Sequence, residues 1–303
     1  SNSSDSSHSR KLEYRRGLRI SWSAARMPIT PRPSVFVRIR SASSSAGSPK
    51  KPSPPFWARR YTPWRKLDEF RNAFDRIVST LIDRADADPN LGERSDVLAS
   101  LLRSGRDDGT GIPRPDLQDE LLTLVCAGHE TTASVLAWAF ERLRRHPGVL
   151  AELVRELDEG GGEFRRATIF EVLRVCSVVD VIGRRVRAPG FDLGNWRIPP
   201  DRTVFVRVAD LHDNPEIFPH PERFDPYRFL GTRPAAPEWL AFGGGARRCI
   251  GADFTVAEID IVLRTVLLNF AIQTDGATDE KSYFRGVAHI PKLGGRIVVN
   301  RRR

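Results

Sequence analysis

The stretch Phe242-Gly-Gly-Gly-Ala-Arg-Arg-Cys-Ile-Gly251 carries most of the information about this chain. Its three consecutive glycines permit backbone conformations that other residues avoid, and they let the backbone approach a flat ligand closely. Cys249 follows them, directly before the apolar pattern of a helix predicted over residues 252–268. A helix amino terminus and the adjacent Arg248 both favour a thiolate over a thiol. Arg247 is placed to pair with a carboxylate.

Other interpretations of this loop differ in the residue types that they require. A phosphate-binding loop needs Lys followed by Ser or Thr after its glycines, and a dinucleotide fingerprint needs GxGxxG after a strand. A cysteine nucleophile needs a histidine base, which the sequence does not identify. A simple glycine turn before a buried cysteine would explain Gly-Gly-Gly-x₃-Cys alone. It does not explain the full spacing Phe-x-x-Gly-x-Arg-x-Cys-x-Gly, which indicates a ligand-binding cysteine.

Helical periodicity dominates the chain from Trp57 onward. Apolar residues at three- and four-residue intervals predict helices over residues 67–82, 96–102 and 117–145, the last with Asp116 as its cap. At 1.5 Å per residue this last helix would be roughly 43 Å long, enough to cross a domain. Its middle, Leu121 to Phe140, is apolar on nearly all sides. We therefore expect it in the centre of the protein.

The remaining pattern predicts a mainly α fold with small β-sheets. His146-Pro147 ends the long helix. One further helix is expected from there to about Glu159, and another over residues 165–175. Short strands are expected over residues 182–187, 203–208, 271–273 and 296–300. Residues 188–201 read as turns, and residues 214–237 as an irregular but packed loop. No internal repeat and no alternating βαβ pattern is present.

The net charge of +10 is confined to one end of the chain. Residues 1–60 contain 13 Lys and Arg but 2 Asp and Glu, whereas the remainder contains 35 basic and 36 acidic residues. This balance argues against a nucleic-acid-binding core. The apolar runs are too short to span a membrane and no secretory signal is visible, so a cytoplasmic protein is expected.

Two segments follow from this composition. Residues 1–56 form a basic arm rich in Ser, Arg and Pro, expected to be disordered or unrelated to the rest, although an acidic partner or a transit-type leader would also fit. Residues 57–303 form the folded part. Cys126 and Cys176 lie within apolar helical patterns and are expected to be small buried hydrophobes. The cysteine spacing contains no structural zinc pattern and no disulfide framework.

The motif residues together resemble the cytochrome P450 family, and most closely its soluble actinobacterial members. Five of them fill every fixed position of that family's haem-binding loop: Phe242, Gly245, Arg247, Cys249 and Gly251. The segments Ala127-Gly-His-Glu-Thr-Thr132, Glu171-Val-Leu-Arg174 and Pro221-Glu-Arg-Phe224 resemble further family motifs in the same order. The resemblance implies the carboxyl-terminal portion of the family's fold: its long central helix, its ExxR helix, its Cys loop and the following helix. It also implies a haem whose iron, the bound metal, is held by the Cys249 thiolate.

The central-helix motif has a physical rationale of its own. Ala127, Gly128 and Thr131 share one helical face, and the two small residues would let that face lie against a macrocycle. Glu130 and Thr131 place a carboxylate and a hydroxyl at one level, which suits proton relay to dioxygen. The resemblance assigns them that catalytic role. The alternative is a solvated surface with back-bonding to carbonyls. His129 lies off this face and is read as a bystander.

The resemblance also assigns a buried structural triad and a propionate contact. Glu171 and Arg174 can pair across one helical turn, and the resemblance adds Arg223 as the third member. Arg184 occupies the position at which many family members contact a haem propionate, with Arg185 as the alternative.

The function implied is a haem-thiolate monooxygenase that inserts one oxygen atom into a hydrophobic organic substrate. Substrate contacts are expected from Thr123, Cys126 and Ala127 and from residues Val178–Ile182. Electrons would come from a ferredoxin-type donor with an NAD(P)H-dependent reductase. Family members usually have a further amino-terminal half, which residues 1–56 do not resemble. The alternatives are therefore a truncated, inactive remnant with impaired haem binding, or a basic-arm binding protein built on an inactive haem fold.

Overall fold

The computed structural model describes residues 12–14, 18–20, 38–39, 64–107 and 112–302. The chain divides into two units, Ser1–Ser34 and Val35–Arg303. In the first unit, strands β1 (Leu12–Tyr14) and β2 (Leu18–Ile20) pair in antiparallel fashion. Nearly all of the basic arm over residues 1–56 lies outside the described residues. The division of the chain at residues 56 and 57 therefore stays a prediction.

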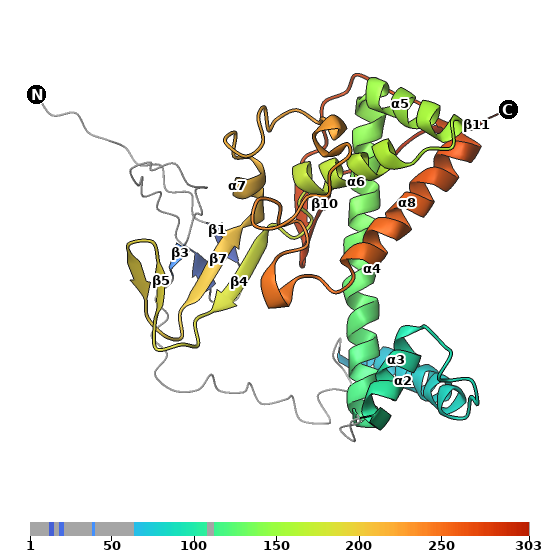
Figure 1. Ribbon diagram of the computed structural model, residues 1–303, viewed down its shortest axis with the longest axis vertical. Coiled ribbons are helices and arrows are strands. Elements are labelled where there is room, and N and C mark those ends of the chain that lie inside the picture. Colours follow the sequence, from blue (N-terminus) through green and yellow to red (C-terminus); the bar gives the residue numbers. More distant parts are fainter. Residues whose placement is uncertain (1–11, 15–17, 21–37, 40–63, 108–111, 303) are drawn as a thin grey trace, which may run out of the picture. The chain divides into compact units, whose positions relative to one another are not determined.

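The second unit is built around one long helix, α4 (Arg114–Arg145) (Figure 1). The helix begins after Pro113, and Pro115 lies in its first turn, where a missing N–H costs nothing. The predicted cap at Asp116 is wrong, because no side chain caps this end and Asp116 lies inside the first turn. Its carboxylate instead complements the positive end of the helix dipole, and Arg144 and Arg145 complement the negative end.

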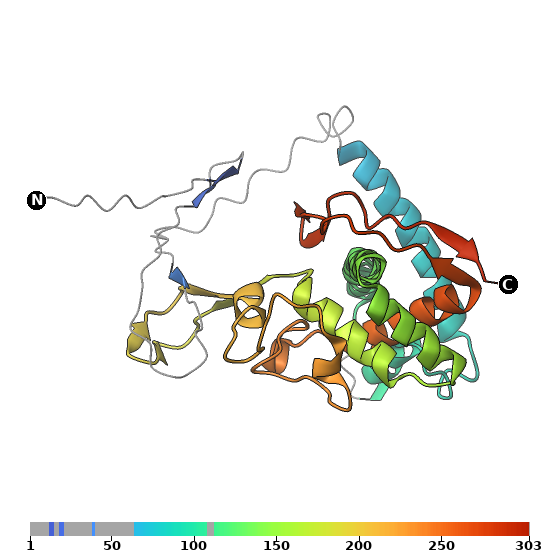
Figure 2. The same ribbon diagram turned by 90° about the horizontal axis from the view of Figure 1, so that it is seen from above.

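Five of the further helices in the described part of the chain confirm the other predicted helical segments. Helices α2 (Trp64–Asp86) and α3 (Val97–Asp107) contact one another, and α2 also contacts α4. Helices α5 (Pro147–Asp158), α6 (Glu163–Val175) and α8 (Ala252–Asn269) pack around the carboxyl-terminal half of α4. Figure 2 looks along α4 and shows these helices and the carboxyl-terminal strands around it.

The hydrophobic core gathers around the second half of α4. Trp138 and Leu143 of that helix are buried together with Phe170 of α6 and with Ile259 and Leu263 of α8. A smaller cluster joins α2, α3 and the start of α4.

The expectation that α4 is buried throughout its middle is wrong for the first half of that stretch. Val125 and the four residues 126–129 are exposed, because no other described element packs on them. Leu117 at the start of α4 is buried in the smaller cluster, and burial along the helix resumes at Thr132 and continues to Leu143.

Small antiparallel sheets complete the mainly α fold. Strands β3 (Arg38–Ile39), β7 (Thr203–Arg207) and β4 (Val181–Arg185) form one sheet in that order, and β11 (Val299–Arg301) pairs with β8 (Phe270–Ile272). Two hairpins were not predicted: β5 (Phe191–Leu193) with β6 (Trp196–Ile198), and β9 (Ser282–Arg285) with β10 (Ala288–Pro291). The first replaces part of the expected turn region over residues 188–201.

The segment between β7 and the Cys loop is irregular but packed, as predicted. It contains the short helix α7 (Val208–His212) and the 3₁₀ turn η1 (Pro226–Phe229). Phe218, Phe224 and Phe229 are buried in the core and anchor it. None of the described helices is both long enough and apolar enough to cross a bilayer.

Candidate functional site

The glycine-rich loop makes a tight, internally bonded turn before α8. Gly243 and Gly245 adopt φ values of 69° and 66°, which side chains with a Cβ rarely tolerate. Gly245 opens the 3₁₀ turn η2 (Gly245–Arg247). The Cys249 N–H then donates to the Phe242 carbonyl at 2.8 Å, which closes the loop. This closure fixes the backbone position of Cys249.

Cys249 lies at the start of α8, as predicted from the sequence. The helix begins at Ala252, with Gly251 as its cap residue. Cys249 is exposed, and so is its neighbour Ile250. The thiol is therefore accessible to a ligand rather than packed as a core residue.

Aromatic side chains, most of them buried, pack against one another beneath the Cys loop. Phe242 is half-buried and meets Trp239 edge-on, with ring centroids 5.7 Å apart. Trp239 in turn stacks on the buried ring of His212. The Nδ1 of His212 lies 3.1 Å from the Arg174 carbonyl, and its Nε2 accepts the Leu240 N–H at 3.1 Å. His212 thus ties α6 to the start of the Cys loop, and the sequence analysis missed it.

His212 is expected to make the protein less stable in acid. Burial lowers the pKa of His212 to about 4, from an ordinary value near 6.5. Between these two values the unfolded chain binds a proton that the folded protein excludes, so the free energy of unfolding falls as the pH drops through this window. The loss across the whole window is on the order of 3 kcal/mol. Urea unfolding between pH 7 and pH 4 measures it.

A matched pair of variants isolates this effect. His212→Gln should flatten the pH profile between pH 6.5 and 4, because glutamine has no proton to take up there. His220→Gln should keep the wild-type profile, since the His220 side chain is largely exposed. Equal acid sensitivity of wild type and His212→Gln would show that the histidine is not responsible.

Two arginines near the loop are available for a ligand carboxylate. Among the described residues, no carboxylate pairs with Arg247, and the Arg184 side chain donates only to the Gly183 carbonyl. Arg185, the alternative to Arg184, is paired with Asp201 at 2.8 Å. The geometry therefore favours Arg184 over Arg185 as a partner for an anionic group.

The two predicted catalytic residues, Glu130 and Thr131, lie on α4 and have different local partners. The Thr131 hydroxyl donates to the Ala127 carbonyl at 2.6 Å, which is the back-bonding that the alternative interpretation describes. The Glu130 carboxylate lies 3.7 Å from Arg285, at the end of strand β9. Ala127 and Gly128 are exposed, and a Cβ placed on Gly128 would meet no heavy atom within 4 Å. This part of α4 therefore has open space beside its small residues.

The ExxR pair is buried and fully bonded. Glu171 and Arg174 are both essentially inaccessible, and two hydrogen bonds of 2.7 and 2.8 Å join them. The remaining N–H groups of Arg174 reach three carbonyls in the following segment, those of His212, Pro221 and Arg223, at 2.9 to 3.1 Å. The pair therefore ties α6 to the irregular segment that precedes the Cys loop.

The prediction that Arg223 is the third member of the triad is wrong. The Arg223 side chain is 69% exposed and points to Glu222, so only its backbone carbonyl meets Arg174. Arg228, five residues later, is 12% exposed, and its Nε lies 3.6 Å from Glu171. The segment Pro226-Tyr-Arg-Phe229 therefore supplies the buried arginine, because η1 turns this side chain toward α6.

The predicted substrate residues are mostly accessible. Thr123 and Cys126 are exposed on α4, so the expectation of a buried Cys126 is wrong. In the segment Val178–Ile182, Val178 is buried and its carbonyl accepts the His289 N–H at 2.8 Å. The His289 ring is 3.1 Å from Asp180. The unpredicted β9–β10 hairpin thus contacts both candidate regions, α4 and Val178–Ile182.

Cys176 is a poor candidate ligand. It is half-buried beside α4, and burial raises the pKa of its thiol to about 12. The thiol therefore stays protonated at neutral pH, as expected for a structural cysteine.

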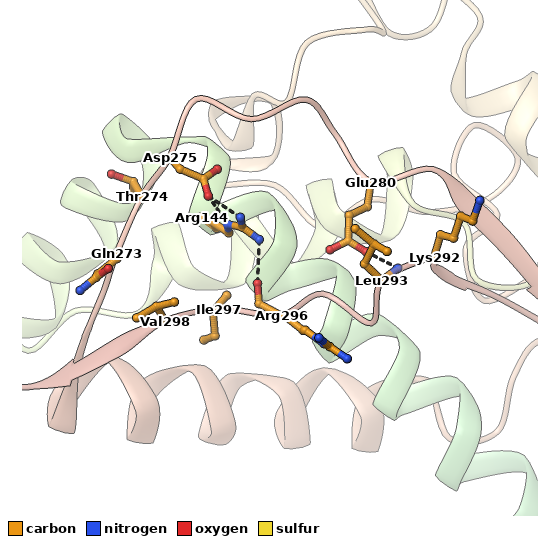
Figure 3. A pocket seen from close by; sticks show the side chains of 10 residues that line it. All are labelled: Arg144, Gln273, Thr274, Asp275, Glu280, Lys292, Leu293, Arg296, Ile297 and Val298. Atoms are coloured by element: carbon orange, nitrogen blue, oxygen red, sulfur yellow. Dashed lines mark hydrogen bonds and ion pairs between the residues drawn. The ribbon is translucent and has the colours of Figure 1, made fainter.

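A separate pocket of about 640 Å³ lies where the carboxyl-terminal strands meet the end of α4 (Figure 3). Arg144 links two segments of the pocket wall, because it pairs with Asp275 and donates to the Arg296 carbonyl at 2.9 Å. On its other side, the buried Glu280 accepts the Leu293 N–H at 2.7 Å. No residue of the candidate site lines this pocket, so the two features are distinct.

Comparison with known proteins decides the family. Residues 39–297 match the family model described as cytochrome P450. The chain belongs to the cytochrome P450 family. The family model matches from residue 39, whereas the resemblance seen in the sequence begins at about Trp57.

Two mycobacterial P450 relatives are similar over most of this chain. A Mycobacterium tuberculosis protein provisionally named cytochrome P450 138 is 51% identical over 243 residues, or 80% of this chain and 55% of the relative. Another, provisionally named cytochrome P450 135B1, is 37% identical over 78% of this chain and 51% of the relative. The chain thus spans about half the length of the curated relatives it matches.

A solved P450 structure shows the same fold. The crystal structure of a cytochrome P450 (CYP102L1) matches with a TM-score of 0.65 at 23% identity, over 82% of this chain and 60% of that one. This likeness confirms the prediction of a mainly α, partial P450 fold.

Proposed function

We propose that this chain is the haem-binding part of a monooxygenase that inserts one oxygen atom into a hydrophobic organic substrate. The observation that carries the proposal is the exposed Cys249 at the amino terminus of α8, held by a closed glycine loop within a P450 fold. Family membership alone leaves the activity open, since the chain spans about half of its relatives.

The residues present fit a haem group. Cys249 would supply the thiolate to iron, and Arg184 and Arg247 have no carboxylate partner among the described residues and would hold the two propionates. The open space beside Gly128 suits the approach of a flat macrocycle. Phe242, Gly245 and Gly251 would shape the loop around the cysteine. When bound, haem supplies the activation of dioxygen.

Glu130 and Thr131 would deliver protons to the reacting oxygen from α4. Because the Thr131 hydroxyl donates to Ala127, its lone pairs remain free to accept a proton donor. Arg285, 3.7 Å from the Glu130 carboxylate, would help to position that side chain. Exposed Thr123, Cys126 and the apolar residues of Val178–Ile182 would contact the substrate. Electrons would arrive from a ferredoxin-type protein and its NAD(P)H-dependent reductase.

Thr131→Ala should uncouple oxygen use from product formation while haem binding stays unchanged. Positioned proton transfer contributes about 10²–10⁴-fold to catalysis, so product formed per NAD(P)H consumed should fall roughly 10-fold or more. The measurement compares NAD(P)H oxidation, peroxide and product in a reconstituted system. Ser134→Ala is the matched control, because Ser134 makes the same backbone hydrogen bond one turn away and is buried. Equal coupling in Thr131→Ala and wild type would contradict the assigned role.

The second candidate is an inactive remnant of such an enzyme with impaired haem binding. A titration of the purified chain with haem separates the two. Stoichiometric binding, at one haem per chain, supports the monooxygenase. A folded chain that binds no haem supports the remnant.

A further inference from the structure

A serine, a histidine and an aspartate form one hydrogen-bonded chain on the β9–β10 hairpin and the segment beside it. The Ser282 Oγ lies 3.1 Å from Nδ1 of His289, and Nε2 of the same ring lies 3.1 Å from an Asp180 carboxylate oxygen. This is the order of groups in which a base activates a hydroxyl and a carboxylate orients the base. The proton delivery proposed for Glu130 and Thr131 uses none of these three side chains.

The hydrogen bonds select the histidine tautomer that can act as a base. A carboxylate only accepts hydrogen bonds, so Nε2 of the neutral His289 ring donates to Asp180. Nδ1 then carries the lone pair and accepts the Ser282 O–H. The ring is therefore oriented to take the serine proton.

Backbone hydrogen bonds hold the base and the carboxylate in place. The His289 N–H donates to the Val178 carbonyl at 2.8 Å, and the His289 carbonyl accepts Nε1 of Trp138 at 2.9 Å. The Asp180 carbonyl accepts the Val208 N–H at 2.7 Å. Because Trp138, Val178 and Val208 are buried, both groups are anchored to the core.

The hydroxyl end of the chain is accessible to a reagent. Ser282 is exposed, whereas the side chains of His289 and Asp180 are 26% and 23% exposed. Residues two apart share a face of a strand, so Phe284 lies on the same face of β9 as Ser282. The centroid of its ring is 5.1 Å from that of the His289 ring. This ring gives an apolar acyl group a surface on which to pack.

A second serine–histidine pair shows what is specific to the first. The Ser177 Oγ also lies 3.1 Å from a histidine Nδ1, that of His212. There, however, Nε2 accepts the Leu240 N–H, so the proton of the neutral ring is on Nδ1, which faces the Arg174 carbonyl. The His212 ring therefore cannot take the proton of Ser177.

We propose that Ser282 is a nucleophile toward carboxylic esters, with His289 as its base and Asp180 as the residue that positions His289. The Ser282 oxygen attacks the ester carbonyl, its proton passes to Nδ1 of His289, and the departing alkoxide takes that proton and leaves as an alcohol. Water repeats the sequence on the acyl-serine and releases the carboxylic acid. The reaction consumes only ester and water.

Covalent labelling of the full 303-residue chain tests the proposal. A fluorophosphonate bonds its phosphorus to the serine oxygen and releases fluoride, and trypsin then frees the peptide Ser282-Tyr-Phe-Arg285 for mass spectrometry. We expect this peptide to carry the label, and Ser282→Ala to lose the hydrolysis of 4-nitrophenyl acetate. His289→Gln should slow labelling at least about 100-fold, because a positioned base is lost. Asp180→Asn should slow it at least about 10-fold, because the tautomer is no longer fixed.

Ser177→Ala is the matched control and should be labelled as the wild type is. An unlabelled Ser282 in the wild-type chain would overturn the proposal, whichever variants fold. So would a labelling rate that His289→Gln leaves unchanged, or ester hydrolysis that is lost with the exposed thiol in Cys126→Ala and kept in Ser282→Ala. Because labelling needs neither haem nor electrons, failure of the proposed monooxygenase activity would leave this result intact.

Discussion

Replacing Cys249 by alanine should abolish thiolate ligation of haem. The loop offers no other sulfur, and the surrounding backbone bonds, such as Cys249 N–H to Phe242, do not need the side chain. The variant should therefore fold as wild type does but lose the electronic absorption and spin-resonance signature of sulfur-ligated iron. We expect haem affinity to drop at least 10-fold, measured by titration.

The other cysteines provide the control. Cys126→Ala changes an exposed thiol on α4, and Cys176→Ala changes a protonated, half-buried one. Both should keep the wild-type spectrum. If Cys249→Ala kept the sulfur-ligated signature while Cys126→Ala lost it, the axial ligand would have to be reassigned to α4.

Replacing Arg174 by methionine should reduce the free energy of unfolding by about 3–5 kcal/mol, because it leaves the buried Glu171 carboxylate without its cation. The variant also loses the hydrogen bonds to His212, Pro221 and Arg223, so the segment before the Cys loop should loosen. Urea unfolding of the apoprotein measures the loss independently of haem.

Arg223 and Arg228 test which arginine completes this cluster. Arg228→Ala removes a nearly buried side chain that lies beside Glu171 and donates to the His220 carbonyl at 2.6 Å, and should cost about 1–3 kcal/mol. Arg223→Ala removes an exposed side chain and should change stability by no more than about 0.5 kcal/mol. The reverse order would restore Arg223 to the cluster.

Helical elements and the Cys loop could be predicted because their signals are local. The spacing of apolar residues defines α2, α4 and α8, and the glycines before Cys249 require the left-handed backbone that the structure shows at Gly243 and Gly245. The position of Cys249 at a helix amino terminus followed from the same reasoning.

Tertiary contacts explain what the sequence could not predict. Pro221-Glu-Arg-Phe224 and Pro226-Tyr-Arg-Phe229 are alike in pattern, and only packing against α6 distinguishes Arg228 from Arg223. The β9–β10 hairpin has strands of four residues, too short for a period-two signal. The apolar composition of the first half of α4 predicts burial, but composition alone does not show whether another element packs on residues 125–129.

The absorption spectrum of the reduced, carbon monoxide-treated chain tests the central assignment most directly. The protein is expressed with a haem precursor, reduced with dithionite and exposed to carbon monoxide. If the Cys249 thiolate holds the iron, the Soret band should lie at the long-wavelength position typical of thiolate-ligated haem. A band at the position of histidine-ligated haem, or folded protein that carries no haem, would contradict the account.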